Sequence, residues 1–111
     1  MPRLPRATDA VVDEIKVRDY LLSAEHPVGR SKARFFESLG YRRESWNRLR
    51  LDLLELAHHG EAIPGIPGPY GLKYEVRATL SGPTSRWARI VTVWIVLEGE
   101  EIPRFVTAYP G

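Results

Sequence analysis

The sequence KYEVRATLSGPTSRWARIVTVWIVL, residues 73–97, decides the fold. In residues 73–80 polar and apolar side chains alternate, which is typical of a strand with one buried face. The segment SGPTS at 81–85 is a turn sequence, and residues 87–97 are rich in the β-branched and aromatic residues of a central strand. A second turn then returns the chain along residues 102–109. The second half of the chain therefore predicts an antiparallel meander.

The first half of the chain predicts helices. Its first helix would cover residues 13–23, although the preceding Ala10-Val11-Val12 is also compatible with a short strand. Two further helices have apolar residues at spacings of three and four, which place them on one face. Their expected limits are Arg30 or Ser31 to Gly40, and an N-cap at Ser45 to about His58. The side chains expected to face the core are Phe35, Phe36, Leu39, Trp46, Leu49, Leu53 and Leu56.

The two halves are joined by residues 60–71, of which seven of twelve are Gly or Pro. This composition predicts a loop, and neither half is large enough to fold alone. We therefore expect a single domain, residues 1–111, with a helical part at 10–59, the loop at 60–71 and a sheet at 72–110. The expected fold class is α+β, with N-terminal helices packed on one face of an antiparallel sheet of three to four strands.

Composition limits the classes of function. The chain has no cysteine, which excludes disulfides, thiolate catalysis and thiolate zinc sites. No signal peptide and no apolar run long enough to span a bilayer is visible, so we expect a cytoplasmic protein with no membrane partner. The net charge is +2, yet residues 27–50 hold seven cations against two carboxylates. Such a segment suits a polyanion partner, although a solvated helix face or a docking site for an acidic protein would have the same composition.

The segment HPVGRSKARFF, residues 26–36, holds the first candidate site. The imidazole of His26 lies in an expected turn and could act as a general acid or base, or be an ordinary surface histidine. The start of the following helix offers backbone amides, with Arg30 and Lys32, to a phosphate. Arg30 and Arg34 are one turn apart and share a face. The alternative is a helix start with exposed cations and no ligand.

The segment FVTAYP, residues 105–110, holds the second candidate site. Strand alternation predicts that Phe105, Thr107 and Tyr109 share one face, where the two hydroxyl groups could bind a phosphate or a nucleotide. A half-buried strand end is the alternative. We add Arg77, on the polar side of its own strand, as a phosphate contact. 

Metal and stacking sites are also conceivable. His58 and His59, with Asp52 and Glu55 at helical spacing, could hold zinc, but histidines at a helix C-terminus are favoured without a metal. We expect no metal and no cofactor. Trp87 and Trp94 should lie on opposite faces of their strand; one would be core, and the other would stack a base or simply pack.

The sequence resembles a family of small uncharacterised bacterial domains with the pattern Y-L-L, then H-P-x-G-x-x-K-A-x-F-F, then T-x-Y-P. The pattern occurs here at residues 20–22, 26–36 and 107–110. Such domains occur near toxin genes and are similar to the barnase/EndoU/colicin/RelE-like ribonuclease superfamily. The resemblance implies N-terminal helices followed by a four-stranded antiparallel sheet.

The resemblance also implies roles for individual residues. His26 would be the acid/base, Arg30 and Lys32 would stabilise the phosphate, and Thr107 and Tyr109 would contact the nucleotide. EndoU-like sites use two histidines, whereas only one is well placed here. His58 or His59 would be the second if the third helix ends near the site; otherwise Lys32 or Tyr109 would supply the second proton transfer.

The resulting hypothesis is a metal-independent endoribonuclease, the toxin of a toxin–antitoxin pair, that cleaves RNA by attack of a ribose 2′-OH. Its partners would be RNA and a cognate antitoxin protein. The alternative is a non-catalytic module that binds RNA or protein, such as an antitoxin or immunity protein. The sequence leaves the oligomeric state open.

Overall fold

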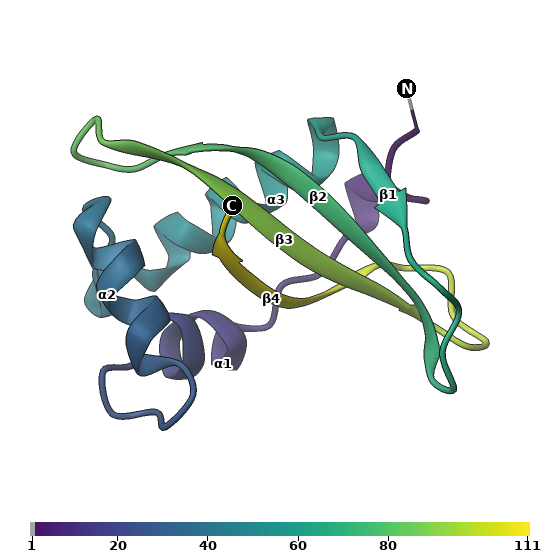
Figure 1. Ribbon diagram of the computed structural model, residues 1–111, viewed down its shortest axis with the longest axis horizontal. Helices are drawn as coiled ribbons and strands as arrows, with labels where there is room; N and C mark the ends of the chain where they lie inside the picture. Colours follow the sequence, from purple (N-terminus) through teal and green to yellow (C-terminus); the bar gives the residue numbers. More distant parts are fainter. Residues whose placement is uncertain (1) are drawn as a thin grey trace.

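An antiparallel four-stranded sheet in the order β1-β2-β3-β4 forms the body of the computed structural model, which describes residues 2–111 (Figure 1). The strands are β1 (Ala62–Pro64), β2 (Gly71–Ser81), β3 (Trp87–Leu97) and β4 (Arg104–Pro110). The helical elements that precede them are η1 (Ala7–Asp9), α1 (Glu14–Lys16), η2 (Val17–Leu21), α2 (Arg30–Ser38), η3 (Arg43–Ser45) and α3 (Trp46–His59).

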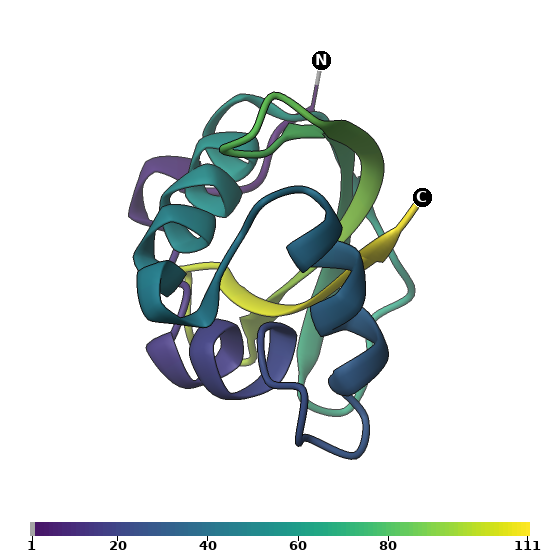
Figure 2. The same cartoon turned by 90° about the vertical axis from the view of Figure 1, so that its left-hand side faces the viewer.

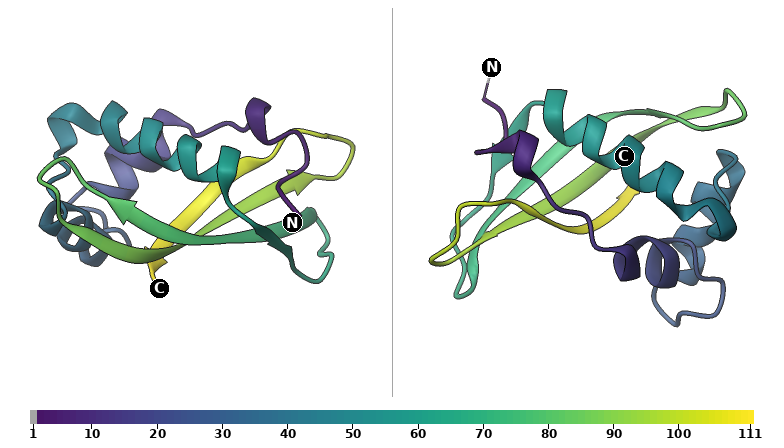
Figure 3. Two further views of the ribbon diagram at one scale, coloured as in Figure 1. Left: turned by 90° about the horizontal axis from the view of Figure 1, so that it is seen from above. Right: turned by 180° about the vertical axis from the view of Figure 1, so that it is seen from behind.

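The helices are distributed unequally around the sheet. Helix α3 and the N-terminal segment cover one face of the sheet, whereas α2 packs at one end, next to α1 (Figure 3). Figure 2 views the molecule from the end where α2 lies, with the helix in front of β4. The expected α+β class, with helices on one face of an antiparallel sheet, is confirmed. No helix within residues 2–111 is long and apolar enough to cross a membrane.

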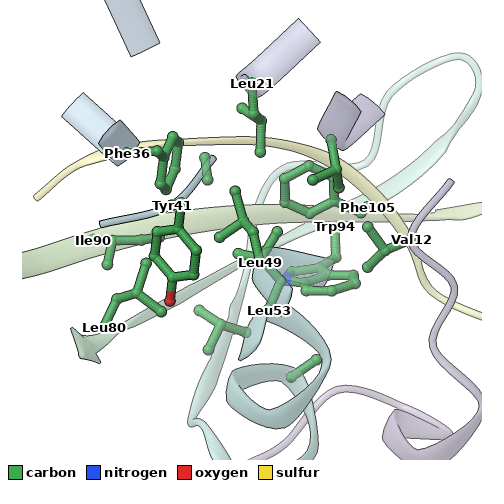
Figure 4. Close-up of a cluster of buried hydrophobic side chains, with 14 of the residues drawn as sticks. Val12, Leu21, Phe36, Tyr41, Leu49, Leu53, Leu80, Ile90, Trp94 and Phe105 are labelled. Atoms are coloured by element: carbon green, nitrogen blue, oxygen red, sulfur yellow. The ribbon is translucent and has the colours of Figure 1, made fainter. Parts of the chain in front are cut away.

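The core lies between α3 and the covered face of the sheet (Figure 4). Leu49 and Leu53 are one helical turn apart and fully buried, as their apolar spacing predicts. They belong to the same buried cluster as Ile90 and Trp94 of β3. Because Trp94 is a large side chain with a polar N–H, its burial requires a hydrogen-bond acceptor, which Thr92 provides at 2.8 Å.

The helices match the sequence predictions closely, with differences at their ends. The helix expected at residues 13–23 corresponds to α1 and η2, which together cover residues 14–21. Val11 makes an isolated bridge to Arg104, so the region has both helical and extended parts. Phe36 and Leu39 are buried and Phe35 is half-buried. Ser45 occupies the N-cap position of α3 as predicted, but its side chain makes no capping hydrogen bond.

The segment 60–71 is not entirely a loop. Its residues Ala62–Pro64 form β1, which pairs with β2 at the edge of the sheet. An edge strand tolerates Pro64 because one side of its backbone has no strand to pair with. The composition therefore excluded a central strand correctly but did not reveal an edge strand.

Strand β4 contains a bulge that the sequence did not reveal. Thr107 pairs with Val93, but the next pair along β3 joins Trp94 to Phe105, so Val106 is an extra residue. Phe105 consequently faces the core, where its ring lies 5.3 Å from that of Trp94. The prediction that Phe105 shares a face with Thr107 and Tyr109 is therefore wrong, since burial of the aromatic ring outweighs regular alternation.

Candidate functional site

Polar side chains gather on the face of the sheet opposite the core. Strand register places Glu75, Val93 and Thr107 in one row across β2, β3 and β4. The neighbouring row consists of Arg77, Val91 and Tyr109, and alternation puts both rows on the same face. Two predicted site residues, Thr107 and Tyr109, thus share a face as expected, and Arg77 lies on the same face.

Lys32 joins three elements at one edge of this face. Its Nζ atom donates hydrogen bonds of 2.7 Å to the hydroxyl of Tyr20, from η2, and to Oγ1 of Thr107, from β4. The two hydroxyl oxygens are 3.3 Å apart. Lys32 itself is carried by α2, whose buried Phe36 fixes the helix against the core. A cation and two hydroxyl groups therefore converge within hydrogen-bond distance of one another.

The environment of Tyr20 changes its acidity. Partial burial acts to raise the pKa of the Tyr20 hydroxyl, but hydrogen bonds from Lys32 and Thr107 and the positive charges of Lys32 and Lys16 outweigh it. The net effect is a pKa below the ordinary value of 10.0. The Lys32 ammonium also lies 5.0 Å from the centroid of the Tyr20 ring. Tyr20 is thus a stronger acid than an ordinary tyrosine.

A second polar chain crosses the sheet beside the Lys32 cluster. The Tyr109 hydroxyl lies 3.4 Å from Oε2 of Glu75, and Arg77 contacts Oε1 of the same carboxylate at 3.2 Å. Val91, between Arg77 and Tyr109 in the register, is buried although it is not part of the core cluster. The polar side chains of this face therefore pack together over an apolar base, and a carboxylate lies among cations and hydroxyls.

His26 lies at the edge of this site and its ring is held in a fixed orientation. Its Nδ1 accepts hydrogen bonds from the backbone amides of Val28, at 3.1 Å, and Gly29, at 3.0 Å. The neutral ring then carries its proton on Nε2. The ring packs edge-on against Tyr20, with centroids 5.1 Å apart. No hydrogen bond within residues 2–111 joins it to Lys32, Thr107 or Tyr109.

These hydrogen bonds also change the predicted anion site at the start of α2. The amide of Gly29 binds the His26 ring, and the amide of Arg30 donates to the carbonyl oxygen of His26 at 3.0 Å. The expectation of amides free for a phosphate is therefore wrong for Gly29 and Arg30. The side chains of Arg30 and Arg34 are exposed and line one small surface depression with Ser31.

The basic segment does not form one continuous free surface. Within residues 2–111, Arg30 and Arg34 make no ion pair, whereas Arg43 pairs with Asp19 and Arg48 pairs with Asp52. Three of the seven cations of this segment, Arg30, Lys32 and Arg34, lie on α2.

The histidine pair at the end of α3 makes a local ion pair. His59 Nε2 is 2.9 Å from Oε1 of Glu55, one helical turn earlier. In the part of the chain that the structure describes, no three His, Cys, Asp or Glu side chains lie close enough together to hold a metal ion.

Sequence reasoning missed two residues of the site, Tyr20 and Glu75. Tyr20 was part of the quoted Y-L-L pattern but had no assigned role. Glu75 was recognised only as one polar residue in an alternating strand. Its position in the same row as Thr107 depends on the register of three strands, which the sequence does not display.

This combination of fold and site defines a small α+β domain with a polar open sheet face. The chain belongs to the family described as domain of unknown function DUF6883, whose model matches residues 3–111. Comparison with curated proteins gives no match. Among solved structures, it is similar to a chain of a contact-dependent growth inhibition toxin–immunity protein complex from Klebsiella pneumoniae 342. The TM-score is 0.70 at 19% sequence identity, and the match covers 94% of this chain and 95% of the other.

Proposed function

We propose that the protein is a metal-independent endoribonuclease that acts as a toxin. The observation that carries this proposal is the Lys32 ammonium, 2.7 Å from both the Tyr20 and Thr107 hydroxyls, on the sheet face that also holds Glu75. Transesterification of RNA needs a base, an acid and positive charge at the phosphate, and these residues supply all three.

Glu75 is the proposed general base. Its side chain is 38% exposed and is oriented by Tyr109 and Arg77. Two inter-strand spacings, about 10 Å, separate its backbone from that of Thr107. A phosphodiester with its ribose fits between these positions, with the 2′-OH toward Glu75.

Tyr20 is the proposed general acid. The carboxylate of Glu75 takes the proton of the 2′-OH, whose oxygen attacks phosphorus, while the bond from phosphorus to O5′ breaks and Tyr20 protonates O5′. The products are a 2′,3′-cyclic phosphate and a free 5′-OH. A proton then returns from Glu75 to Tyr20 through solvent. The lowered pKa of Tyr20 favours its proton donation near neutral pH.

Lys32, Arg77 and Thr107 bind the phosphate in this mechanism. Negative charge that develops on the non-bridging oxygens is stabilised by the two cations and by the Thr107 hydroxyl. Arg30 and Arg34, exposed on α2, contact neighbouring phosphates.

His26 has a positioning role in this mechanism. Because Nδ1 accepts the backbone hydrogen bonds from Val28 and Gly29, the neutral ring could take up a proton only if the turn gave up these bonds. The ring is also packed against Tyr20, so it fixes the orientation of the proposed acid. We expect His26→Ala to lower kcat through Tyr20 without changing the chemistry.

The toxin role is supported by fold similarity to a chain of a toxin–immunity protein complex. A toxin that cleaves cellular RNA acts in the cytoplasm and requires a neutralising protein partner in the cell that makes it. We therefore include such a partner in the proposal.

The proposal is tested with purified protein and a single-stranded RNA in a buffer that contains a chelator. We expect cleavage to fragments with 2′,3′-cyclic phosphate ends, and no cleavage where a 2′-deoxynucleotide replaces the nucleotide that supplies the nucleophile. Glu75→Gln should lower kcat by about 10²- to 10⁴-fold. The matched control is Glu55→Gln, on the exposed side of α3, which should cleave like the wild type.

Two outcomes would contradict the proposal. Cleavage of the deoxy-substituted bond would exclude the 2′-OH as the nucleophile. RNA that stays intact with wild-type protein, while growth is still inhibited on expression, would exclude ribonuclease action as the cause of toxicity.

A further inference from the structure

Trp87 is exposed in a way that the fold does not explain. The side chain of Trp94 is fully buried and its N–H is satisfied, whereas Trp87 is 66% exposed at the start of β3. A tryptophan buries a large apolar area when it packs, so one left in solvent on a regular strand is a candidate contact for a ligand.

Trp87 lies on the same face of the sheet as the proposed active site. It is four residues from Val91, which pairs with Tyr109, and an even separation along a strand keeps the face unchanged. Four residues of strand span about 13 Å. Trp87 therefore faces the same side as the proposed reaction centre, too far away to touch the cleaved linkage.

The surface between the two positions is positively charged. Arg89 lies between Trp87 and Val91 on the same face of β3, Arg77 faces the same side from β2, and residues 76–97 contain no Asp or Glu. Within residues 2–111, Arg89 makes no ion pair, and it is held along the face by a 3.3 Å hydrogen bond to Thr79. Cations that follow a strand and end at an exposed indole complement a polyanion that carries flat bases.

We propose that Trp87 is a stacking subsite for an unpaired base of single-stranded RNA, with Arg89 binding an adjacent phosphate. The inference rests on the proposed ribonuclease function and deepens it. The substrate is then a single strand longer than a dinucleotide, because the bases of a duplex are not available for stacking on a side chain.

Binding is measured with a hexanucleotide that carries 2′-O-methyl groups, so that it cannot be cleaved by 2′-OH attack. The hexanucleotide carries a fluorescein label whose anisotropy reports binding by every variant, and Trp87→Ala should weaken binding about 5- to 100-fold. Trp87→Phe retains an aromatic face and should recover most of the affinity. Because Trp87 is exposed, these variants should unfold at the wild-type temperature.

Cleavage assays with a long and a short substrate test whether Trp87 contacts the RNA away from the cleaved linkage. For Trp87→Ala we expect a raised KM for a cleavable hexanucleotide, with kcat unchanged, and wild-type kcat/KM for a dinucleotide that cannot reach Trp87. Arg89→Ala should raise KM for the hexanucleotide in the same way.

The outcomes separate this inference from the proposed function. Equal affinity of wild type and Trp87→Ala for the 2′-O-methyl hexanucleotide, with RNA cleavage intact, would overturn the stacking subsite alone. Binding that depends on Trp87, with no RNA cleaved, would overturn the nuclease and leave Trp87 as an RNA contact. If Trp87→Ala abolished capture of a protein partner but left hexanucleotide binding unchanged, the surface would be a protein interface.

Discussion

Lys32 supports both the structure and the proposed chemistry. Its ammonium group donates to two hydroxyls that come from η2 and β4, and it is the main source of the lowered pKa of Tyr20. An arginine would not reproduce this arrangement, because the N–H donors of a guanidinium lie in one rigid plane and are farther apart. A point charge on a flexible stem suits two acceptors 3.3 Å apart.

Replacing Lys32 should therefore change the titration of Tyr20. In Lys32→Met the lowering contributions of the ammonium are lost while burial remains, so the pKa of Tyr20 should rise relative to the wild type. The difference in ultraviolet absorbance between each protein and its Tyr20→Phe counterpart isolates this one tyrosine. An unchanged titration in Lys32→Met would contradict the assigned cause.

The same acid should produce an alkaline limit to activity. A general acid must be protonated, so kcat should fall as pH rises through the pKa of Tyr20, which lies below 10.0. In Tyr20→Phe this fall of kcat at high pH should be absent: its kcat should be lower than that of the wild type and should not change with pH in this range. Tyr70→Phe, at an exposed position, serves as the control and should keep the fall of kcat.

Thr92 is the polar residue at the centre of the core. Its Oγ1 accepts a hydrogen bond from Trp94 and donates one of 2.9 Å to the carbonyl oxygen of Val76. Thr92→Val keeps the shape but leaves a buried N–H unpaired, so the free energy of unfolding should fall by about 1–3 kcal/mol. Urea unfolding measures the change, and the exposed Thr79→Val should stay within about 0.5 kcal/mol of the wild type.

At the scale of elements, an ion-pair network connects the helical segments. Asp19 of η2 accepts hydrogen bonds from Arg18 and from Arg43 of η3, and these bonds lower the pKa of Asp19 to about 2. Because the pKa is lower in the folded protein than its ordinary value of 3.8, the contribution to stability is present above pH 3.8. It is lost as the pH falls through about 2.

Asp19→Asn should therefore be less stable than the wild type at pH 5. The difference should shrink between pH 3.8 and about 2 and vanish below it, because the wild-type carboxyl is then protonated. Thermal unfolding across this range measures the difference. A gap that stays constant with pH would show that charge is not the source of the effect.

The contact between α2 and η2 depends on Gly29. A Cβ atom at this position would overlap the carbonyl oxygen of Tyr20. Gly29→Ala should push α2 away from η2, with a loss of about 1–3 kcal/mol in the free energy of unfolding and a loss of RNA cleavage. Gly65→Ala meets only an ordinary contact with Lys73 and is the matched control. Full activity in Gly29→Ala would show that the spacing of the two elements is not critical.

Element limits could be predicted well where periodicity is strong. The spacing of Leu49 and Leu53 predicted the helix α3. Strand alternation predicted that Trp87 and Trp94 lie on opposite faces of β3. The bulge at Val106 could not be predicted, because it depends on how Phe105 fits against Trp94 from another strand. Strand alternation alone assumes a regular ladder.

At the scale of the whole molecule, the site is made from distant parts of the sequence. Tyr20 and Thr107 are 87 positions apart, and Glu75 and Tyr109 are 34 apart. The sequence indicated Lys32, Thr107 and Tyr109 as candidates because they occur in recognisable segments. It did not indicate Glu75, since a carboxylate on a polar strand face is common and only the register gives it neighbours.

The distribution of charge over the molecule should determine how RNA binding responds to salt. Each phosphate that a cation neutralises contributes about −0.7 to the slope of log K against log salt concentration for a single strand. The double variant Arg30→Ala with Arg34→Ala should reduce the slope by about 1.4. Arg48→Ala, whose guanidinium already pairs with Asp52, should leave it unchanged. Equal slopes in all three proteins would exclude α2 from the path of the RNA.

The exposed segment between β1 and β2 divides the proposed catalytic groups in an unusual way. Tyr20 and Lys32 precede it, and Glu75 and Thr107 follow it. A chain divided between Ile66 and Pro67 would give two polypeptides, each without half of the reaction machinery and each harmless to its host. Mixed together, they could reassemble through the pairing of β1 with β2 and the packing of α3 on the sheet. The proposed toxin could thus be produced as two inactive fragments and activated by complementation.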